Sequence, residues 1–407
     1  MAKKVICFAL GGHIANQNAS FEELKHLLPE YEFYGAVNGF EAFKTTERQN
    51  LNEYKIKSNL AGCVFGSGRH SLTNKNGEID DEKAQRAIRY FKEWGFDIAV
   101  GSGGDDHGMQ MNLLEKILKE SKGEIGKDVD VFVLNKTMDN DLGGPEALTD
   151  FTNGFHTAIK TSVDDIRQHF NGAWTNNLPY IVGLFGRETN WVGATAAYFG
   201  NADRFIYGEL SEQHPGHSIE KIHDLIVESQ DENEKIYGKR FAMIIVPEGT
   251  RISGIKHADS SIIDEHGHHK LNPAVLVSEL KKNLERKFGL KTHDPAITYE
   301  MRNFAPTKKD LEYGRMSAGV IAEAIRQGAS GYESVFKIQD GEITADIDLI
   351  EKVSQKRYVE DYKIKPIIDK ENFKVSDEIG RYYKPLFGNK IPLEEWIHDK
   401  PIIERLK

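Results

Sequence analysis

Two stretches of the chain decide its fold: Ile98-Ala99-Val100-Gly101-Ser102-Gly103-Gly104-Asp105-Asp106 and Val131-Phe132-Val133-Leu134-Asn135-Lys136-Thr137-Met138-Asp139-Asn140-Asp141. Each begins with a short apolar run, which is typical of a buried strand, and continues into a loop of glycines or polar residues. Because ligands bind outside the carboxyl ends of strands in an open parallel sheet, we expect both loops to lie at a binding site.

Helical patterns follow the strand-like runs. A helix is predicted after the first loop by apolar residues near helical spacing, namely Met109, Leu113, Leu114 and Ile117. A second helical stretch is expected to begin near Leu148, beyond Gly143-Gly144-Pro145, and a third covers Ser218 to Val227. The alternation of strands and helices, without repeats at solenoid periods, predicts α/β layers.

The residue types in the two loops point to phosphoryl transfer. That reaction needs a base for the attacking hydroxyl and fixed positive charge for the transferring group. Asp139 supplies a carboxylate, Lys136 lies three residues before it, and Asp105 could hold Mg²⁺ directly or through water. Gly103 and Gly104 allow the backbone to approach the donor closely. Together the loops look like two halves of one site.

With these loops the chain resembles the phosphofructokinase family, whose members carry Gly-Gly-Asp-Gly or Gly-Gly-Asp-Asp followed by Thr-x-Asp-x-Asp. Further motifs occur in the family's order: Gly66-Ser67-Gly68-Arg69, Gly154-Phe155-His156-Thr157-Ala158, Gly183-Leu184-Phe185-Gly186-Arg187, Val246-Pro247-Glu248-Gly249 and Tyr299-Glu300-Met301-Arg302. The resemblance covers about residues 8 to 320. It implies two doubly wound, Rossmann-like α/β domains with a cleft between them.

The resemblance also implies roles for individual residues. Asp139 matches the general base that takes the proton from the sugar's 1-hydroxyl, with Lys136 and Asp106 completing the catalytic set, and Asp105 matches the residue associated with the metal. The donor would be held by Gly12, Arg69, Asp106 and Lys136. The sugar phosphate would be held by Thr137, Asp139, Asp141, Phe185, Gly186, Arg187, Glu248, Tyr299 and Arg302.

Simpler interpretations exist for four of these residues. Asp141 could cap the following turn, which is a common use of aspartate. Arg69 could form a surface ion pair, and Arg302 could be buried against a helix. Tyr299 ends a strand-like run, where an aromatic side chain ordinarily packs.

Asp106 and Lys136 bear on the phosphoryl donor. Family members that use ATP usually have glycine at the first position and often at the second, whereas diphosphate-dependent members have aspartate and lysine, as here. An aspartate side chain places volume and negative charge where the α-phosphate of ATP would pass. Lys136 would supply a point charge to the leaving phosphate. Since some ATP users share the lysine, the aspartate decides the donor prediction.

The predicted reaction is the reversible, Mg²⁺-assisted transfer of phosphate from diphosphate to the 1-hydroxyl of fructose 6-phosphate. Alternatives are an ATP-dependent 6-phosphofructokinase, a sedoheptulose 7-phosphate kinase of the same fold, and a non-catalytic relative that binds sugar phosphate and regulates. A kinase that shares only Gly-Gly-Asp, such as a lipid kinase, is disfavoured by the second loop.

Several positions depart from the family pattern and keep these alternatives open. Only the glycine pair and Asn18 of the usual amino-terminal phosphate loop are present. His107 stands where serine or threonine is usual, Glu188 adds negative charge beside Arg187, and Leu178 replaces an arginine that many tetrameric members contribute to a neighbouring site.

We expect the donor domain at residues 1–147 plus about 303–345, the sugar-phosphate domain at 148–302, and a carboxyl-terminal extension of unknown role at 346–407. At 407 residues the chain is long enough for two substantial cores.

The overall charge of −10, with no basic stripe, counts against a nucleic-acid partner. Two cysteines, Cys7 and Cys63, suggest packing roles in a reducing cytoplasm, and no signal peptide or spanning helix is expected. We expect a homo-oligomer, either a dimer or a tetramer. The histidines of segment 257–270 could suggest a metal site, although an exposed polar loop explains them better.

Overall fold

The computed structural model describes residues 2–53, 55–187, 189–208, 216–255, 258–263, 269–362 and 365–398. The chain divides into two compact units. Unit 1 comprises residues 1–158, 260–270 and 299–361, and unit 2 comprises 159–259, 271–298 and 362–407. His257, His266 and His268 of the histidine-rich segment lie outside the described residues.

Unit 1 is built on a seven-stranded sheet in the order β13-β12-β5-β4-β1-β2-β3. Its strands are β1 (Lys4–Ala9), β2 (Glu32–Ala36), β3 (Arg48–Asn50), β4 (Ile98–Gly103), β5 (Asp130–Asn135), β12 (Tyr332–Gln339) and β13 (Glu342–Leu349). The pairs from β12 to β2 are parallel, and only β13 and β3 at the edges run antiparallel to their neighbours. This is the parallel-dominated α/β sheet that the sequence predicts.

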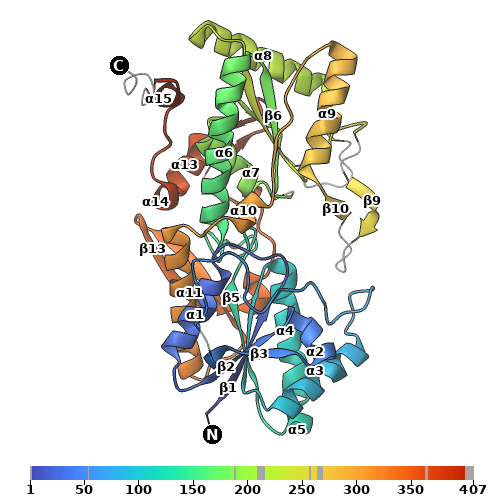
Figure 1. The fold of residues 1–407 in the computed structure, drawn as a ribbon, viewed down its shortest axis with the longest axis vertical. Helices are drawn as coiled ribbons and strands as arrows, with labels where there is room; N and C mark the ends of the chain where they lie inside the picture. The colour runs from blue at the N-terminus through green and yellow to red at the C-terminus, as the bar shows by residue number, and fades with distance from the viewer. Residues whose placement is uncertain are drawn as a thin grey trace. The chain divides into compact units, whose positions relative to one another are not determined.

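Helices cover both faces of this sheet, and each face has its own apolar core. One core joins the sheet to α2 (Ala42–Thr45), α3 (Asp81–Trp94) and α4 (Asp105–Glu120) through residues such as Phe43, Phe91 and Leu114. The other joins it to α1 (Gln17–Leu27) and α11 (Lys308–Arg326) through Phe21 and Ile321. Figure 1 shows α1 and α11 side by side, although they are far apart in the sequence. The short helices α5 (Lys122–Ile125), α10 (Glu300–Asn303) and α12 (Ile350–Val353) complete the unit.

The strand order places the predicted loops where a ligand is expected. The chain proceeds from β1 outward to β2 and then returns to add β4 and β5 on the other side of β1. The topological switch point therefore lies between β1 and β4, and the crevice outside their carboxyl ends is the usual binding position in such sheets. Gly11 and Gly12 follow β1, Asp105 follows β4 and Lys136 follows β5.

Unit 2 is built on a four-stranded parallel sheet in the order β11-β6-β8-β7. Its strands are β6 (Pro179–Leu184), β7 (Arg204–Phe205), β8 (Ala242–Pro247) and β11 (Ala296–Ile297), and its longer helices are α6 (Phe155–Asn176), which begins in unit 1, α7 (Trp191–Phe199), α8 (Ile219–Tyr237) and α9 (Pro273–Phe288). Two further two-stranded sheets pair β9 (Ala258–Ile263) with β10 (His269–Leu271) and β14 (Ile368–Asp369) with β15 (Lys374–Val375). Across the described part of the chain, no helix has both the length and the apolar character needed to cross a membrane.

The predicted helices after the first loop and from Ser218 are confirmed, whereas the one expected near Leu148 is wrong. The hydroxyl of Ser218 accepts the Lys221 N–H and caps α8. On α4 the buried face includes Met111 and Leu114, whereas Met109 is exposed.

The helix that was expected near Leu148 begins at Phe155 instead. Turns and irregular backbone precede it, and the Asp150 N–H donates to Phe336 O on β12 at 2.8 Å. Asp310, which is fully buried, then accepts the backbone N–H groups of Gly154 at 3.1 Å and Thr157 at 2.8 Å and caps the first turn. The pattern near Leu148 was therefore overridden by pairing with a strand from a much later part of the chain.

The carboxyl-terminal residues contribute to both units. Residues 346–361 belong to unit 1, which also extends through Ala158, and 362–407 belong to unit 2. In unit 2 the short helices α13 (Asp377–Tyr382), α14 (Lys384–Phe387) and α15 (Leu393–His398) follow β15. Tyr383 is fully buried and its ring centroid lies 6.0 Å from that of Trp191 on α7. The segment 346–407 therefore contributes structure to both units.

Candidate active site

The loop that carries Arg69 is joined to the end of β1. Gly11 N donates to Gly68 O at 2.8 Å, and Gly68 N donates to Ala9 O at 3.3 Å. Arg69 is thereby held beside the glycine pair with an exposed side chain. The Gly11 N–H is already used in this pairing, so this part of the amino-terminal loop does not offer it to a phosphate.

Side chains from elsewhere in unit 1 approach the backbone closely at positions 11 and 12. Gly11 has φ +78°, and a Cβ at that position would lie 2.8 Å from the imidazole of His107. A Cβ at Gly12 would collide with the guanidinium of Arg302, whose Nη1 also donates to His13 O at 3.5 Å. The imidazole of His107, which stands where the family usually has serine or threonine, therefore packs against Gly11. The guanidinium of Arg302 lies at Gly12, beyond the end of β1.

Asp105 and Asp106 form the first turn of α4, after Gly104 in an extended conformation. Both side chains are half-buried. The free N–H groups and the dipole of a helix amino terminus stabilise negative charge, so carboxylates suit this position. Gly104 also lies against Thr137, with a built Cβ 3.5 Å from the threonine Cβ. The loops after β4 and β5 are thus in direct contact, as the sequence predicts for two halves of one site.

The loop after β5 is held in a defined shape by its own side chains and by segment 152–154. Asp139 N donates to the hydroxyl of Thr137 at 3.0 Å, while Thr137 N donates to Asn153 O at 3.2 Å. Thr152 Oγ1 donates to Thr137 O at 2.6 Å. Asp139 remains half-buried, so its carboxylate is positioned without being enclosed.

Lys136 is the most perturbed cation of the site. Its side chain is 4% exposed, and Nζ donates to Leu10 O at 3.0 Å. Burial, together with the positive charges of Arg302 and Arg69, lowers the pKa of Lys136 to about 7 against the opposing effect of Asp139 and Asp141. The charged groups that act on Lys136 are therefore residues predicted for the same site. A buried cation of this kind is typical of a functional site.

Arg357 was missed by the sequence reasoning although it holds the loop after β5 in place. Its side chain is 1% exposed. The guanidinium donates to Thr149 O at 2.6 Å, Asp150 O at 3.0 Å and Asn140 O at 3.1 Å. Because all three acceptors are backbone carbonyls, the arginine fixes the path of the chain from 140 to 150.

The residues before Arg357 run beside the same loop, and we name residues 353–357 the bracing segment. Gly143 N donates to Val353 O at 2.7 Å, Gly144 N donates to Gln355 O at 2.9 Å, and Arg357 N donates to Asp141 O at 2.7 Å. Leu142 and Lys356 form an antiparallel bridge. No local motif marks this segment in the sequence, and the whole of unit 2's main sheet lies between it and the loop along the chain.

Lys356 extends from the bracing segment to the carboxylate after β4. Its Nζ lies 3.5 Å from Asp105 Oδ2, and each side chain is 22% exposed. Among the described side chains, no cluster of three or more acidic, histidine or cysteine residues forms a ready-made metal cage. Mg²⁺ is usually held by one or two carboxylates together with substrate phosphates and water, so Asp105 with the adjacent Asp106 fits that ion.

The structure bears on the simpler interpretations of Tyr299, Arg302 and Asp141. Tyr299 precedes α10 and is 56% exposed, which is contrary to a packing role in a strand. Arg302, on the same helix, is half-buried and faces the glycine loop. Asp141 is 3% exposed, and its carbonyl is bonded to the bracing segment.

In unit 2 the parallel neighbours β6 and β8 bring a second group of predicted residues together. Glu248 N, just beyond β8, donates to Leu184 O at the end of β6 at 2.8 Å. Gly186 has φ +139° and Arg187 has φ +39°. A positive φ is rare for any residue other than glycine. Backbone strain of this kind persists where the surrounding structure imposes it, often at binding sites.

The surroundings of Arg187 include one such constraint. Asn190, at φ +66° and fully buried, accepts the Gly208 N–H at 2.8 Å and donates to Gly208 O at 2.9 Å. This reciprocal pair fixes the end of the loop before α7 begins at Trp191. Glu188 lies outside the described residues.

The predicted site residues therefore form two groups. Unit 1 contains Gly12, Arg69, Asp105, Asp106, Lys136, Thr137, Asp139, Asp141, Tyr299 and Arg302. Unit 2 contains Phe185, Gly186, Arg187 and Glu248. The first group combines carboxylates with a buried lysine and arginines, and the second places an arginine and a buried carboxylate at adjacent strand ends.

Comparison with known proteins identifies the family. Pyrophosphate--fructose 6-phosphate 1-phosphotransferase of Dictyoglomus thermophilum is 25% identical over 298 residues, covering 72% of this chain and 76% of that protein. ATP-dependent 6-phosphofructokinase of Haemophilus influenzae is 24% identical over 337 residues, covering 82% and 88%. The crystal structure of pyrophosphate-dependent phosphofructokinase from Nitrosospira multiformis shares the fold, with a TM-score of 0.73 at 16% identity over 96% of this chain and 93% of that chain. A family model described as Phosphofructokinase matches residues 4–325, and the chain therefore belongs to the phosphofructokinase family.

Proposed function

We propose that the protein transfers a phosphoryl group from diphosphate to the 1-hydroxyl of fructose 6-phosphate, forming fructose 1,6-bisphosphate and phosphate. The observation that carries the proposal is the buried Lys136, which lies in the field of Asp139, Arg302 and Arg69 beside a helix that begins with two aspartates. The family and its diphosphate-dependent members support the same reaction. Because a diphosphate bond and a sugar phosphate ester differ little in free energy, the reaction runs in both directions.

Asp139 acts as the general base. Its carboxylate takes the proton of the 1-hydroxyl as the hydroxyl oxygen bonds to the transferring phosphorus, and the bond to the departing phosphate breaks. Its backbone N–H is anchored to the hydroxyl of Thr137 at 3.0 Å, which limits the movement of the loop during the transfer. The departing phosphate carries the negative charge, and Lys136 and Arg69 stabilise it.

Mg²⁺ would be held by Asp105, with Asp106 beside it, and when bound it would neutralise charge on the donor phosphates. Arg187, Glu248, Tyr299 and Arg302 bind the sugar phosphate, with arginine for the phosphate and carboxylate for the hydroxyl groups. Phe185, Gly186, Thr137 and Asp141 complete that binding set. Homo-oligomeric assembly and a reducing cytoplasmic location, which the two free cysteines suit, belong to the same proposal.

Asp106 selects diphosphate. It lies in the first turn of α4, directly beside the metal-binding Asp105, where its carboxylate repels the additional phosphate of a nucleotide. A coupled assay with fructose 6-phosphate, Mg²⁺ and either diphosphate or ATP tests this assignment. Wild type is expected to turn over with diphosphate alone, and Asp106→Gly is expected to gain activity with ATP. Turnover by wild type with ATP and none with diphosphate would refute the donor assignment.

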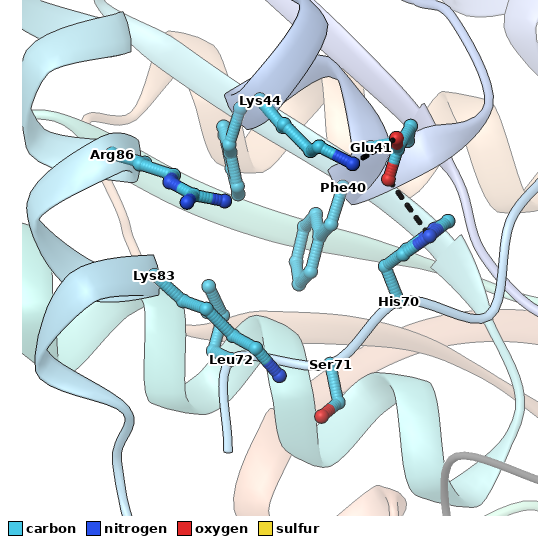
Figure 2. Close-up of a pocket in the computed structure, with 9 residues that line it drawn as sticks. Phe40, Glu41, Lys44, His70, Ser71, Leu72, Lys83 and Arg86 are labelled. Carbon is cyan, nitrogen blue, oxygen red and sulfur yellow. Dashed lines mark ion pairs between the residues drawn. The ribbon is translucent and has the colours of Figure 1, made fainter. Parts of the chain in front are cut away.

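Use of ATP is the second candidate because one observation favours it besides the ATP-dependent relative. A cavity of about 150 Å³ begins at His70, directly after Arg69. Figure 2 shows the ring of Phe40 within it, Lys83 and Arg86 at one side, and Glu41 in ion pairs with His70 and Lys44 at the other. An aromatic floor with cations at its rim suits the nucleoside part of a donor longer than diphosphate. The ATP arm of the assay tests this candidate.

Sedoheptulose 7-phosphate is an alternative acceptor, since the sequence after Arg187 departs from the family pattern. The same assay with that sugar decides between the two acceptors by the ratio of their kcat/KM values. A protein that binds either sugar phosphate in calorimetry but transfers no phosphate from any donor would instead be the non-catalytic regulatory relative.

A further inference from the structure

We propose that Lys356, which lies beyond the residues matched by the family model, is a donor-binding residue of the active site. The inference rests on the proposed function, because Asp105 is taken as the residue that holds Mg²⁺ against the donor phosphates. Lys356 Nζ lies 3.5 Å from Asp105 Oδ2. Its ammonium is therefore next to the carboxylate that would hold the metal against the donor.

The backbone on both sides of Lys356 is fixed to the loop after β5. Gln355 O accepts the Gly144 N–H at 2.9 Å, and Arg357 N donates to Asp141 O at 2.7 Å. The guanidinium of Arg357 adds three bonds to carbonyls of the same loop. The backbone of Lys356 is therefore held against the loop after β5, while its side chain reaches the carboxylate after β4.

The contact with Asp105 has the character of an exchangeable pair. A charge-assisted hydrogen bond between an ammonium and a carboxylate is about 2.7–2.9 Å long, and the observed 3.5 Å is longer. Each side chain is 22% exposed, so both charges are largely removed from water but are still reached by it. Lys356 neutralises Asp105 before the donor arrives. With Asp105 holding the metal, Lys356 would bond to a donor oxygen instead, and the positive charge would stay in the site.

Equilibrium binding separates this role from a purely structural ion pair. Titration calorimetry measures the affinity of Mg²⁺-diphosphate for wild type, Lys356→Met and Lys356→Arg, without sugar phosphate and therefore without turnover. Removing a charged hydrogen-bond donor is expected to weaken diphosphate binding about tenfold or more, whereas Lys356→Arg keeps the charge and most of the affinity. The KM for fructose 6-phosphate is expected to change less than about twofold.

Lys352→Met is the matched control, since Lys352 is an exposed lysine on α12, four residues before Lys356. It is expected to bind diphosphate as wild type does. Unchanged diphosphate affinity in Lys356→Met, with or without a lower melting temperature, would overturn the inference. If Lys356→Met fails to fold, Lys356→Gln, which can still donate a hydrogen bond, provides the neutral variant.

Failure of the proposed function gives a different result. If wild type binds Mg²⁺-ATP and not Mg²⁺-diphosphate, the donor assignment falls, and Lys356 is then judged by the same comparison with ATP as the titrant. Equal ATP affinities of wild type and Lys356→Met would refute the inference in that case as well.

Discussion

The ammonium nitrogen of Lys136 lies 3.0 Å from the carbonyl oxygen of Leu10, to which it donates a hydrogen bond. Lys136 directly follows β5 and Leu10 directly follows β1, so this bond joins the ends of two strands that β4 separates in the sheet. A neutral carbonyl satisfies one donor hydrogen without cancelling the charge of the lysine. When it is protonated, Lys136 therefore keeps its attraction for an entering phosphate.

Diphosphate binding is expected to be accompanied by proton uptake at Lys136. The pKa of Lys136 is lowered to about 7 by burial and by Arg302 and Arg69, so above that pH the free site holds the neutral amine. Donor phosphates bring negative charge and raise this pKa again, so that a proton is bound from solution. Calorimetry at pH 8 in buffers of different ionisation enthalpy measures the uptake. Lys136→Arg stays charged and is expected to take up less, whereas equal uptake in both proteins would contradict the role of Lys136.

Asp139→Asn is expected to lower kcat by at least about a hundredfold, because the amide cannot accept the hydroxyl proton. The substitution keeps the shape of the side chain and the backbone bond to Thr137, so the melting temperature should change little. Asp128→Asn, an exposed aspartate in the same unit, is the control and should retain full activity. If Asp139→Asn kept more than a tenth of the wild-type kcat, another group would have to be the base.

Gly12→Ala is expected to raise the KM for the sugar phosphate. The new methyl group would collide with the guanidinium of Arg302, which must move from the end of β1. Gly123→Ala, a helical position where a Cβ meets nothing within 4 Å, is expected to behave as wild type. Steady-state kinetics of both variants with sugar phosphate varied tests this. An unchanged KM in Gly12→Ala would contradict the expectation that displacing the Arg302 guanidinium weakens sugar-phosphate binding.

Arg357→Met is expected to lower both stability and kcat. Leaving buried carbonyls without donors costs about 1–3 kcal/mol each, so the free energy of unfolding in urea should fall by about 3 kcal/mol or more. Measured well below the melting temperature, kcat should fall more than KM rises, because the loop that carries Asp139 loses its alignment. Arg357→Lys should restore the charge but little of the activity, since a single ammonium cannot reach three separate carbonyls. A stability loss with wild-type kcat would limit Arg357 to a structural role.

Glu333→Gln is expected to change how stability depends on pH. Glu333 is fully buried on β12 against the bracing segment, and burial raises its pKa well above the ordinary value of 4.5, against the hydrogen bond from Ser354. Because the folded protein keeps a proton that the unfolded chain releases, this carboxyl lowers the free energy of unfolding as the pH rises above about 4.5.

Urea denaturation at pH 5 and pH 8 measures that effect. The stability of Glu333→Gln relative to wild type should be higher at pH 8 than at pH 5, whatever the constant offset from repacking. Glu342→Gln, an exposed site on β13, should show no such difference. A constant offset for Glu333→Gln at both pH values would mean that Glu333 is ionised in the folded protein.

The sequence predicted the parts of the site that follow directly from local pattern. The loops with Asp105 and Lys136 were recognised because in each of them an apolar run, a turn and polar side chains follow one another directly along the chain. The switch point between β1 and β4 then brings these loops to one edge of the sheet. The alternation of elements was enough for the fold class.

Features that depend on distant pairing could not be read in the same way. The pattern near Leu148 suggested a helix, but that stretch is irregular and its Asp150 N–H bonds to Phe336 O on β12. No sequence motif marks Arg357 or Lys356. An arginine that bonds to backbone carbonyls, as Arg357 does, places no requirement on the residue types of its partners. Their roles emerge only when strands and loops from distant parts of the sequence are brought together.

The discontinuity of unit 1 has a consequence for its synthesis. The chain leaves the unit at Ala158 and completes it only at Asp361, which at ~5–20 residues per second corresponds to roughly 10–40 s of translation. Until α11 and β12 emerge from the ribosome, one apolar face of β1 and β5 and the outer edge of β5 lack their partners. A nascent chain that already contains the catalytic loops thus exposes a strand edge prone to non-native pairing, and we expect its yield in vivo to depend on chaperones that bind such intermediates.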